Sequence, residues 1–231
     1  MAGELPEEAR WVRGQALSGL VFAVFLSLHL ANAAAGALGP SAYDGLLARV
    51  RLVYQFPAFE VLAVGASAAV HASYGARRSF ARRRRARAGE RAPAPGWLRL
   101  HRASGWLLLV VLPGHALATR GPGLFLDLPA DFSFLRFSLQ TWPWFMIPYY
   151  LILYSAGIYH LLHGTLLALR VAGLRTPAPT ALGARALLCV ALAAGGAAVA
   201  SMAGASGPSD TSRYGAFRAL YEEYAPFMVN W

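Results

Sequence analysis

Four histidines lie inside apolar stretches of the sequence and are spaced as two pairs: His29, His71, His115 and His160. The first two are 42 residues apart and the last two are 45 residues apart. Imidazole nitrogens bind transition metals, carry protons near neutral pH and form hydrogen bonds between helices. Metal binding, proton transfer and helix packing are therefore the chemistries to weigh for these positions.

The surroundings of these histidines repeat between the two halves of the chain. The stretch QALSGLVFAVFLSLHLAN at 15–32 matches HRASGWLLLVVLPGHALAT at 101–119, and the second histidine of each half lies in HASYG or HLLHG. In a helix these spacings put the small residues on the face of the histidine. Such a face has room for a flat, wide group or for a close neighbouring helix. The small residues concerned are Ser18, Gly19, Gly75, Ser104, Gly105 and Gly164.

The composition indicates that lipid is the solvent of most of this chain. Hydrophobic residues make up 57% of the 231 residues and charged residues only 14%. No barrel-like alternation appears, so segments that cross about 30 Å of hydrocarbon must be helices. We predict an all-α integral membrane bundle with an internal two-helix repeat, forming a single membrane domain. Its five transmembrane helices are expected at 16–38, 57–79, 103–120, 143–169 and 181–204, the third with a kink at Pro113.

The distribution of charge predicts an orientation. All 21 cationic residues are arginine, and they gather between the apolar stretches, which argues against a nucleic-acid partner despite the net charge of +10. Ten of them lie in the segment 77–102, and fifteen in all fall on one side of the membrane. By the positive-inside rule this Arg-rich loop and the N-terminus are cytoplasmic, whereas the C-terminal segment 204–231 is outside. The acidic N-terminus shows no cleavage pattern, so we predict no signal peptide.

The orientation decides which histidines can meet. His29 and His115 are expected in the outer half of the membrane, and His71 and His160 in the inner half, separated by roughly 10 Å along the membrane normal. Two imidazoles at one depth are the axial ligands of a low-spin haem iron and leave no open position for a substrate, which implies electron transfer. Zinc would need four ligands at one depth. We therefore predict two b-type haems, with hydrogen bonding between helices as the alternative.

Two further histidines leave choices open. His163 is three residues from His160 and is the rival ligand, although His160 keeps the spacing to glycine that His71 has. His101 lies at the cytoplasmic end of the third span, where it could contact a haem propionate or face lipid headgroups. The arginine run 82–85 fits headgroup contact, and an acidic soluble partner as well.

Taken together in order and spacing, four motifs resemble a known family over roughly residues 11 to 203. They are SG…HLAN, FEVLAVGASAAVHASYG, HRASG…H and YHLLHG. The family is the single-chain, five-helix, dihaem cytochrome b subunit of succinate:quinone oxidoreductases and menaquinol:fumarate reductases. The sequence departs from the family at His163, in its long Arg-rich loop and in its C-terminal segment.

The resemblance implies a subunit function in the bacterial cytoplasmic membrane. It implies the same pairing of histidines, an iron–sulfur subunit and a flavoprotein docked on the cytoplasmic side, and electron transfer to or from quinone. Menaquinone is favoured over ubiquinone. Nothing in the chain resembles a flavin site, a cysteine cluster or a dicarboxylate pocket, so that chemistry belongs to partner subunits.

The quinone and the haem propionates need polar partners as well. Glu60, which matches an acidic position of the family, is the first candidate for a quinone-site acid and Asp44 the second. A helix N-terminal acid that meets the dipole is the alternative for Glu60. The candidate propionate contacts are Arg77, Arg78, Arg102 and Arg170 at the inner haem and Arg120 at the outer haem.

Two other functions stay open from the sequence. One is the cytochrome b subunit of another quinone-linked complex, a hydrogenase or a formate dehydrogenase. The other is a membrane transporter or scaffold without haem, whose histidines serve a proton path or helix packing. A haem spectrum distinguishes a cytochrome b from a transporter or scaffold without haem. The identity of the docked partner distinguishes a hydrogenase or formate dehydrogenase subunit from the predicted complex.

Overall fold

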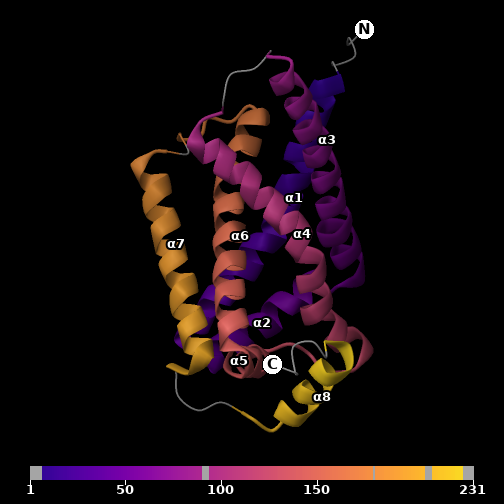
Figure 1. Cartoon of the computed structure of the whole chain (residues 1–231), viewed down its shortest axis with the longest axis vertical. Helices are drawn as coiled ribbons and strands as arrows, with labels where there is room; N and C mark the ends of the chain where they lie inside the picture. The colour runs from indigo at the N-terminus through magenta and orange to yellow at the C-terminus, as the bar shows by residue number, and fades with distance from the viewer. Residues whose placement is uncertain (1–6, 90–93, 179, 206–209, 226–231) are drawn as a thin grey trace. The chain divides into compact units, whose positions relative to one another are not determined.

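The computed structural model describes residues 7–89, 94–178, 180–205 and 210–225, and every regular element in them is a helix, as predicted (Figure 1). Two of the helical segments, η2 and η3, are π-helical, and η1 is a 3-10 helix. The elements in chain order are α1 (Glu7–Ala35), η1 (Gly36–Leu38), α2 (Pro40–Tyr54), η2 (Phe59–Ala66), α3 (Ser67–Arg87), α4 (Gly96–Phe125), α5 (Phe132–Thr141), α6 (Pro143–Val171), α7 (Leu182–Ala200), η3 (Ser201–Ala205) and α8 (Tyr214–Tyr224).

Four stretches of helix in the described residues are long and apolar enough to cross a membrane. They are α1 with η1, α4, α6, and α7 with η3. The predicted span at 57–79 belongs to a bent pair, in which Pro40–Tyr54 and Phe59–Arg87 meet at 95° and reach the hydropathy of a span only together. The described part of the chain therefore has four candidate spans, or five when the bent pair counts as one. Pro57 lies at this bend, where a helix begins and its missing N–H is tolerated.

Several boundaries differ from those predicted; α1, for example, begins at Glu7 rather than at residue 16. The Arg-rich segment 77–102 is mostly helical, because α3 continues to Arg87 and α4 already begins at Gly96. Arginine is a good helix former, so the run of cations extends the helix rather than ending it. The third span continues through Pro113 and Pro122 to Phe125, five residues beyond the predicted end. Part of the predicted outer segment, 206–209 and 226–231, lies outside the described residues.

The contacts of the chain divide it into two compact units, and each is described by itself. The first unit comprises Met1–His29, Val50–Leu109 and Ala156–Cys189. The second unit comprises Leu30–Arg49, Val110–Ser155 and Val190–Trp231. The boundary falls inside α1, α2, α4, α6 and α7, and the expectation of a single membrane domain stays a prediction.

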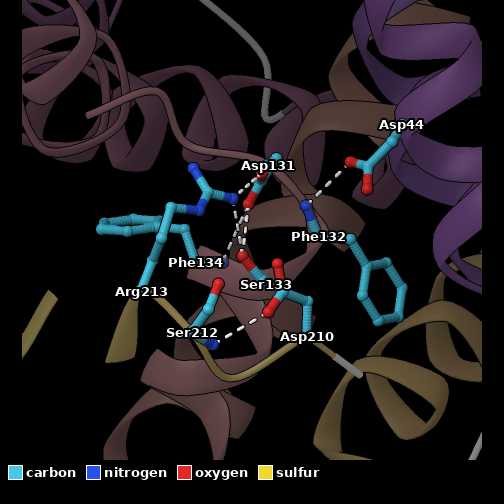
Figure 2. Close-up of polar contacts among 8 residues, drawn as sticks. All are labelled: Asp44, Asp131, Phe132, Ser133, Phe134, Asp210, Ser212 and Arg213. Atoms are coloured by element: carbon cyan, nitrogen blue, oxygen red, sulfur yellow. Dashed lines mark hydrogen bonds and ion pairs between the residues drawn. The ribbon is translucent and has the colours of Figure 1, made fainter. Parts of the chain in front are cut away.

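The core of the second unit forms around the short helix α5. Nearly all of its residues are buried, and Phe217 of α8, which packs against Phe134 and Phe137, is fully buried as well. Two carboxylates cap the N-terminus of α5: Asp44 accepts a hydrogen bond from the backbone N–H of Phe132 (3.0 Å), and Asp131 accepts one from that of Phe134 (3.2 Å) (Figure 2). These bonds satisfy N–H groups that have no partner inside the helix.

An ion pair fastens α8 to the same end of α5. The guanidinium of Arg213 pairs with Asp131 and donates a hydrogen bond to the hydroxyl of Ser133 (2.9 Å) (Figure 2). Asp210 accepts a hydrogen bond from the backbone N–H of Ser212 (2.8 Å) just before α8 begins. Asp131 therefore both caps α5 and pairs with Arg213, so its carboxylate joins two segments that are distant in the sequence.

Arg136 of α5 is a buried cation, only 1% exposed. It donates a hydrogen bond to the backbone carbonyl of Ser201 (2.9 Å) and lies over the ring of Phe132 (5.2 Å to its centroid). The π-helical segment η3, which follows α7, offers the carbonyl of Ser201, and a buried charge needs such a partner.

Candidate functional site

His71 of α3 and His160 of α6 lie beside each other in the first unit. Their ring centroids are 6.0 Å apart and their planes are at 87°. Two imidazoles that share one metal ion have centroids roughly 6 Å apart, because each metal–nitrogen bond is about 2 Å long. The separation of the two rings therefore suits ligands of a common iron.

The hydrogen bonds of these rings determine which nitrogen is left for a metal. Nδ1 of His71 lies 2.9 Å from the backbone carbonyl of Gln15, and Nδ1 of His160 lies 3.2 Å from that of His101. A carbonyl oxygen only accepts, so each Nδ1 carries the proton and donates it. In a neutral imidazole Nε2 then has the lone pair, which is the tautomer of a histidine that binds metal through Nε2.

Two glycines allow the rings to lie where they do. A Cβ on Gly19 of α1 would be 2.7 Å from Nδ1 of His71, and a Cβ on Gly105 of α4 would be 2.8 Å from Cε1 of His160. Both distances are too short for a real contact. Because the space for a side chain is taken by an imidazole at both positions, the predicted small residues Gly19 and Gly105 adjoin the histidines directly.

Three of the other four predicted small residues, Gly75, Gly164 and Ser104, also lie at this cluster. A Cβ on Gly75 would be 2.8 Å from the side-chain nitrogen of Gln15. A Cβ on Gly164 would be 3.2 Å from the ring of His101. The serines differ: Ser104 Oγ lies 3.2 Å from Nδ1 of His160, whereas Ser18 donates its hydroxyl proton to the backbone carbonyl of Gly14 in its own helix (2.7 Å). Ser104 is thus a second contact for the His160 ring.

His101 is closer to the histidine pair than we expected from the sequence. Its ring stacks on that of His160, with centroids 4.3 Å apart and planes at 14°. Its Nδ1 is buried and has no hydrogen-bond partner among the described residues. A buried polar atom without a partner costs about 1–3 kcal/mol, so this nitrogen fits a polar group of a bound molecule. The sequence signals for it were the HRASG motif and its position at the end of the third predicted span.

His163, the rival ligand, has different neighbours. It is buried, and its ring stacks on Tyr159 (centroids 4.0 Å apart) and on Trp97 (6.1 Å). Its Nδ1 lies 3.1 Å from the backbone carbonyl of Tyr159 in the preceding turn of α6. The ring contacts of His163 are therefore aromatic, whereas His160 has the contact with His71.

The predicted outer pair is divided between the two units. His29 of α1 belongs to the first unit and stacks on Phe25 (centroids 5.6 Å apart, planes at 23°). His115 of α4 belongs to the second unit, and its Nδ1 lies 3.2 Å from the hydroxyl oxygen of Tyr149. The pairing of His29 with His115 stays a prediction.

The candidate cations have several surroundings. Arg78 is half-buried and donates to the side-chain oxygen of Gln15, next to the histidine cluster, whereas Arg77 is exposed. Arg170 donates to the hydroxyl of Thr176 (2.7 Å) and to the carbonyl of Pro177 (2.6 Å), so it closes the end of α6. The remaining two, both half-buried on α4, are Arg102 and Arg120.

The two candidate quinone-site acids lie in different elements. Asp44 is a cap of α5 in the second unit, and this bond occupies one of its oxygens. Glu60 lies in the first turn of η2, where a negative charge meets the positive end of the helix dipole. The structure thus gives Asp44 a role in the fold.

The described residues contain no group of three or more His, Cys, Asp or Glu side chains that could hold a metal ion. A haem iron with two axial histidines needs only a pair, because the macrocycle supplies the other ligands. No family model, no curated protein and no solved structure matches the chain.

Proposed function

We propose that this chain is a dihaem b cytochrome that carries electrons through a membrane. His71 and His160 would hold the inner haem iron, and His29 and His115 the outer one. The observation that carries the proposal is the pair of half-buried imidazoles 6.0 Å apart, each with Nδ1 bonded to a backbone carbonyl of another helix. Packing alone does not require both rings to adopt the tautomer that presents Nε2.

The matched contacts of the two halves at the inner histidine pair support the internal repeat. Gln15 and His101 are equivalent in the aligned motifs, and each presents its carbonyl to the second histidine of its own half. Each also packs against the glycine four residues beyond that histidine. One interaction scheme thus occurs twice, which is expected when two similar helix pairs each supply one ligand to the same group.

The residues of the chain have three tasks in this function. The four histidines bind, and the carbonyls of Gln15 and His101 orient two of them. The apolar spans exclude water, so that the centres are insulated from solvent. Arg78, Arg102 and the buried Nδ1 of His101 are candidates for the propionates of the inner haem. Each haem, when bound, accepts and releases one electron.

The family resemblance extends the proposal to a complex. The chain would anchor an iron–sulfur subunit and a flavoprotein of a succinate:quinone oxidoreductase at the cytoplasmic face of a bacterial membrane. It would pass electrons between that subunit and menaquinone, with Glu60 as the first candidate for the acid at the quinone. The C-terminal turns of α3, which carry the exposed Arg83, Arg84, Arg85 and Arg87, supply a cationic surface for an acidic partner.

The test is haem quantitation together with a reduced-minus-oxidised spectrum of the purified chain. We expect two haems b per chain, one in His71→Ala and in His160→Ala, and two in the matched variant His163→Ala. Fewer than two haems in the unaltered chain would contradict the proposal, and loss only in His163→Ala would reverse the choice of ligand. No haem at all would favour a proton path or a scaffold.

The complex is tested separately by purification of the chain with its partners. Reduction of the haems by succinate, and a copurified flavoprotein, are the expected results. A copurified hydrogenase or formate dehydrogenase would leave the dihaem proposal intact and replace the proposed complex.

A further inference from the structure

Tyr149 of α6 is the hydroxyl partner of a predicted haem ligand. Its phenolic oxygen lies 3.2 Å from Nδ1 of His115, and both residues belong to the second unit. Its ring is held by Phe145, stacked with centroids 5.8 Å apart, and by Tyr150, edge-on at 5.0 Å. The position of the hydroxyl is therefore fixed by packing on two sides.

The direction of this hydrogen bond follows from the role proposed for His115. An imidazole that binds iron through Nε2 keeps its proton on Nδ1, so His115 donates and the phenolic oxygen of Tyr149 accepts. His71 and His160 have the equivalent proton held by backbone carbonyls, which no substitution removes. At His115 the acceptor is a side chain, and so it can be exchanged.

We propose that Tyr149 is a positioning residue for the outer haem. It holds His115 in the tautomer and orientation that present Nε2, and it raises the basicity of the ligand by accepting its Nδ1 proton. A residue that accepts a hydrogen bond from a metal-binding histidine changes the electron density that the histidine gives to the metal. For a haem, the property that changes is the reduction potential. This inference rests on the proposed function and assigns the outer centre a residue that sets its potential.

The chain offers a matched control in the next residue. Tyr150 contacts the same imidazole through its ring, with centroids 6.5 Å apart and planes at 82°. Phenylalanine at either position keeps the aromatic ring and removes only a hydroxyl. Tyr149→Phe therefore tests the hydrogen bond, whereas Tyr150→Phe tests the loss of a hydroxyl from the same surroundings.

The experiment is a redox titration with electron paramagnetic resonance spectra of the purified chain, in which the outer haem is the signal that His115→Ala removes. We expect Tyr149→Phe to raise the midpoint potential of that haem and to shift its low-field signal, because the ligand becomes less electron-donating. The inner haem should not change, and Tyr150→Phe should leave both haems unchanged. No shift in Tyr149→Phe, or equal shifts in the two variants, would overturn the inference alone.

Two further outcomes are decisive. Should Tyr149→Phe lose the outer haem, Tyr149→Gln restores an acceptor: recovery of the haem would support the inference, and absence from both variants would overturn it. A chain without haem, or one in which His115→Ala keeps both haems, would overturn the proposed function as well as this inference.

Discussion

The backbone carbonyl of Gln15 accepts a hydrogen bond from Nδ1 of His71 across 2.9 Å. The partner belongs to α1 and the histidine to α3, so the orientation of the ring depends on how these two helices pack. Gly19, one turn beyond Gln15, permits that packing, since any Cβ there would meet the imidazole. The orientation of His71 is therefore determined by a carbonyl and a glycine of the same helix.

Substitution of Gly19 or Gly105 by alanine should disturb the inner histidine pair. The added methyl group would lie 2.7–2.8 Å from an imidazole atom, so the ring must move or the helices must separate. Overpacking of this kind costs about 1–3 kcal/mol. We expect each variant to lose the inner haem preferentially, measured by haem quantitation and by the spectrum of the remaining centre.

Gly196→Ala in α7 is the matched control for these glycines. A Cβ at Gly196 has open space within 4 Å, and alanine is the better helix former by up to about 1 kcal/mol. This variant should keep its haems and unfold at the same temperature or a higher one. Equal haem loss in all three variants would show that these glycines are needed for the helices in general and not for the contact with the imidazole rings.

Much of the helical architecture could be predicted from the sequence, because long apolar segments have few alternatives in lipid. The candidate spans α1, α4, α6 and α7 each cover a predicted segment. The two histidines of the predicted inner pair, His71 and His160, are in contact, and this pairing was predicted from the orientation and depth of the helical spans. Such features depend on local composition and on helical period, both of which are visible in one chain.

Other features depend on contacts that the sequence does not display. The helices α5 and α8 are too short and too polar to be recognised as spans, and α5 is buried only because distant segments cover it. Arg136 is buried because Ser201, 65 residues later, offers its carbonyl. The stacking of His101 on His160 requires that α4 and α6 meet at one register, which neither motif specifies.

His101→Gln should keep both haems. The carbonyl that holds His160 belongs to the backbone of residue 101 and survives the substitution, and glutamine is the residue at the equivalent position 15. The variant also removes a buried nitrogen without a partner, so we expect its free energy of unfolding to lie within about 1 kcal/mol of that of the unaltered chain. Loss of the inner haem from this variant would identify His101, and not its carbonyl, as the essential group.

Arg213→Ala should loosen α8 from α5. The substitution breaks the ion pair with Asp131 and the hydrogen bond to Ser133, and the partly exposed pair contributes on the order of 1 kcal/mol. We expect faster proteolysis within the C-terminal helix and a lower unfolding temperature. Arg218→Ala, on an exposed position of the same helix, is the control and should change stability by less than about 0.5 kcal/mol. Equal effects of both variants would indicate a loss of charge rather than of this contact.

Tyr221 should make the attachment of α8 sensitive to alkaline pH. Burial raises the pKa of its phenol, although the hydrogen bond with the hydroxyl of Ser138 (2.8 Å) opposes that shift. Because the pKa is higher in the folded chain, the unfolded chain loses this proton first. The resulting stability is fully present below the ordinary tyrosine pKa of about 10 and is lost as the pH rises through the folded pKa.

The measurement is the thermal unfolding temperature between about pH 8 and about pH 11, a range that brackets the ordinary tyrosine pKa. We expect this temperature to fall as the pH rises, and to fall less in Tyr221→Phe. The same variant should be less stable at pH 8 by about 1 kcal/mol, since the bond to Ser138 is lost. An identical alkaline decline in both proteins would assign it to other groups.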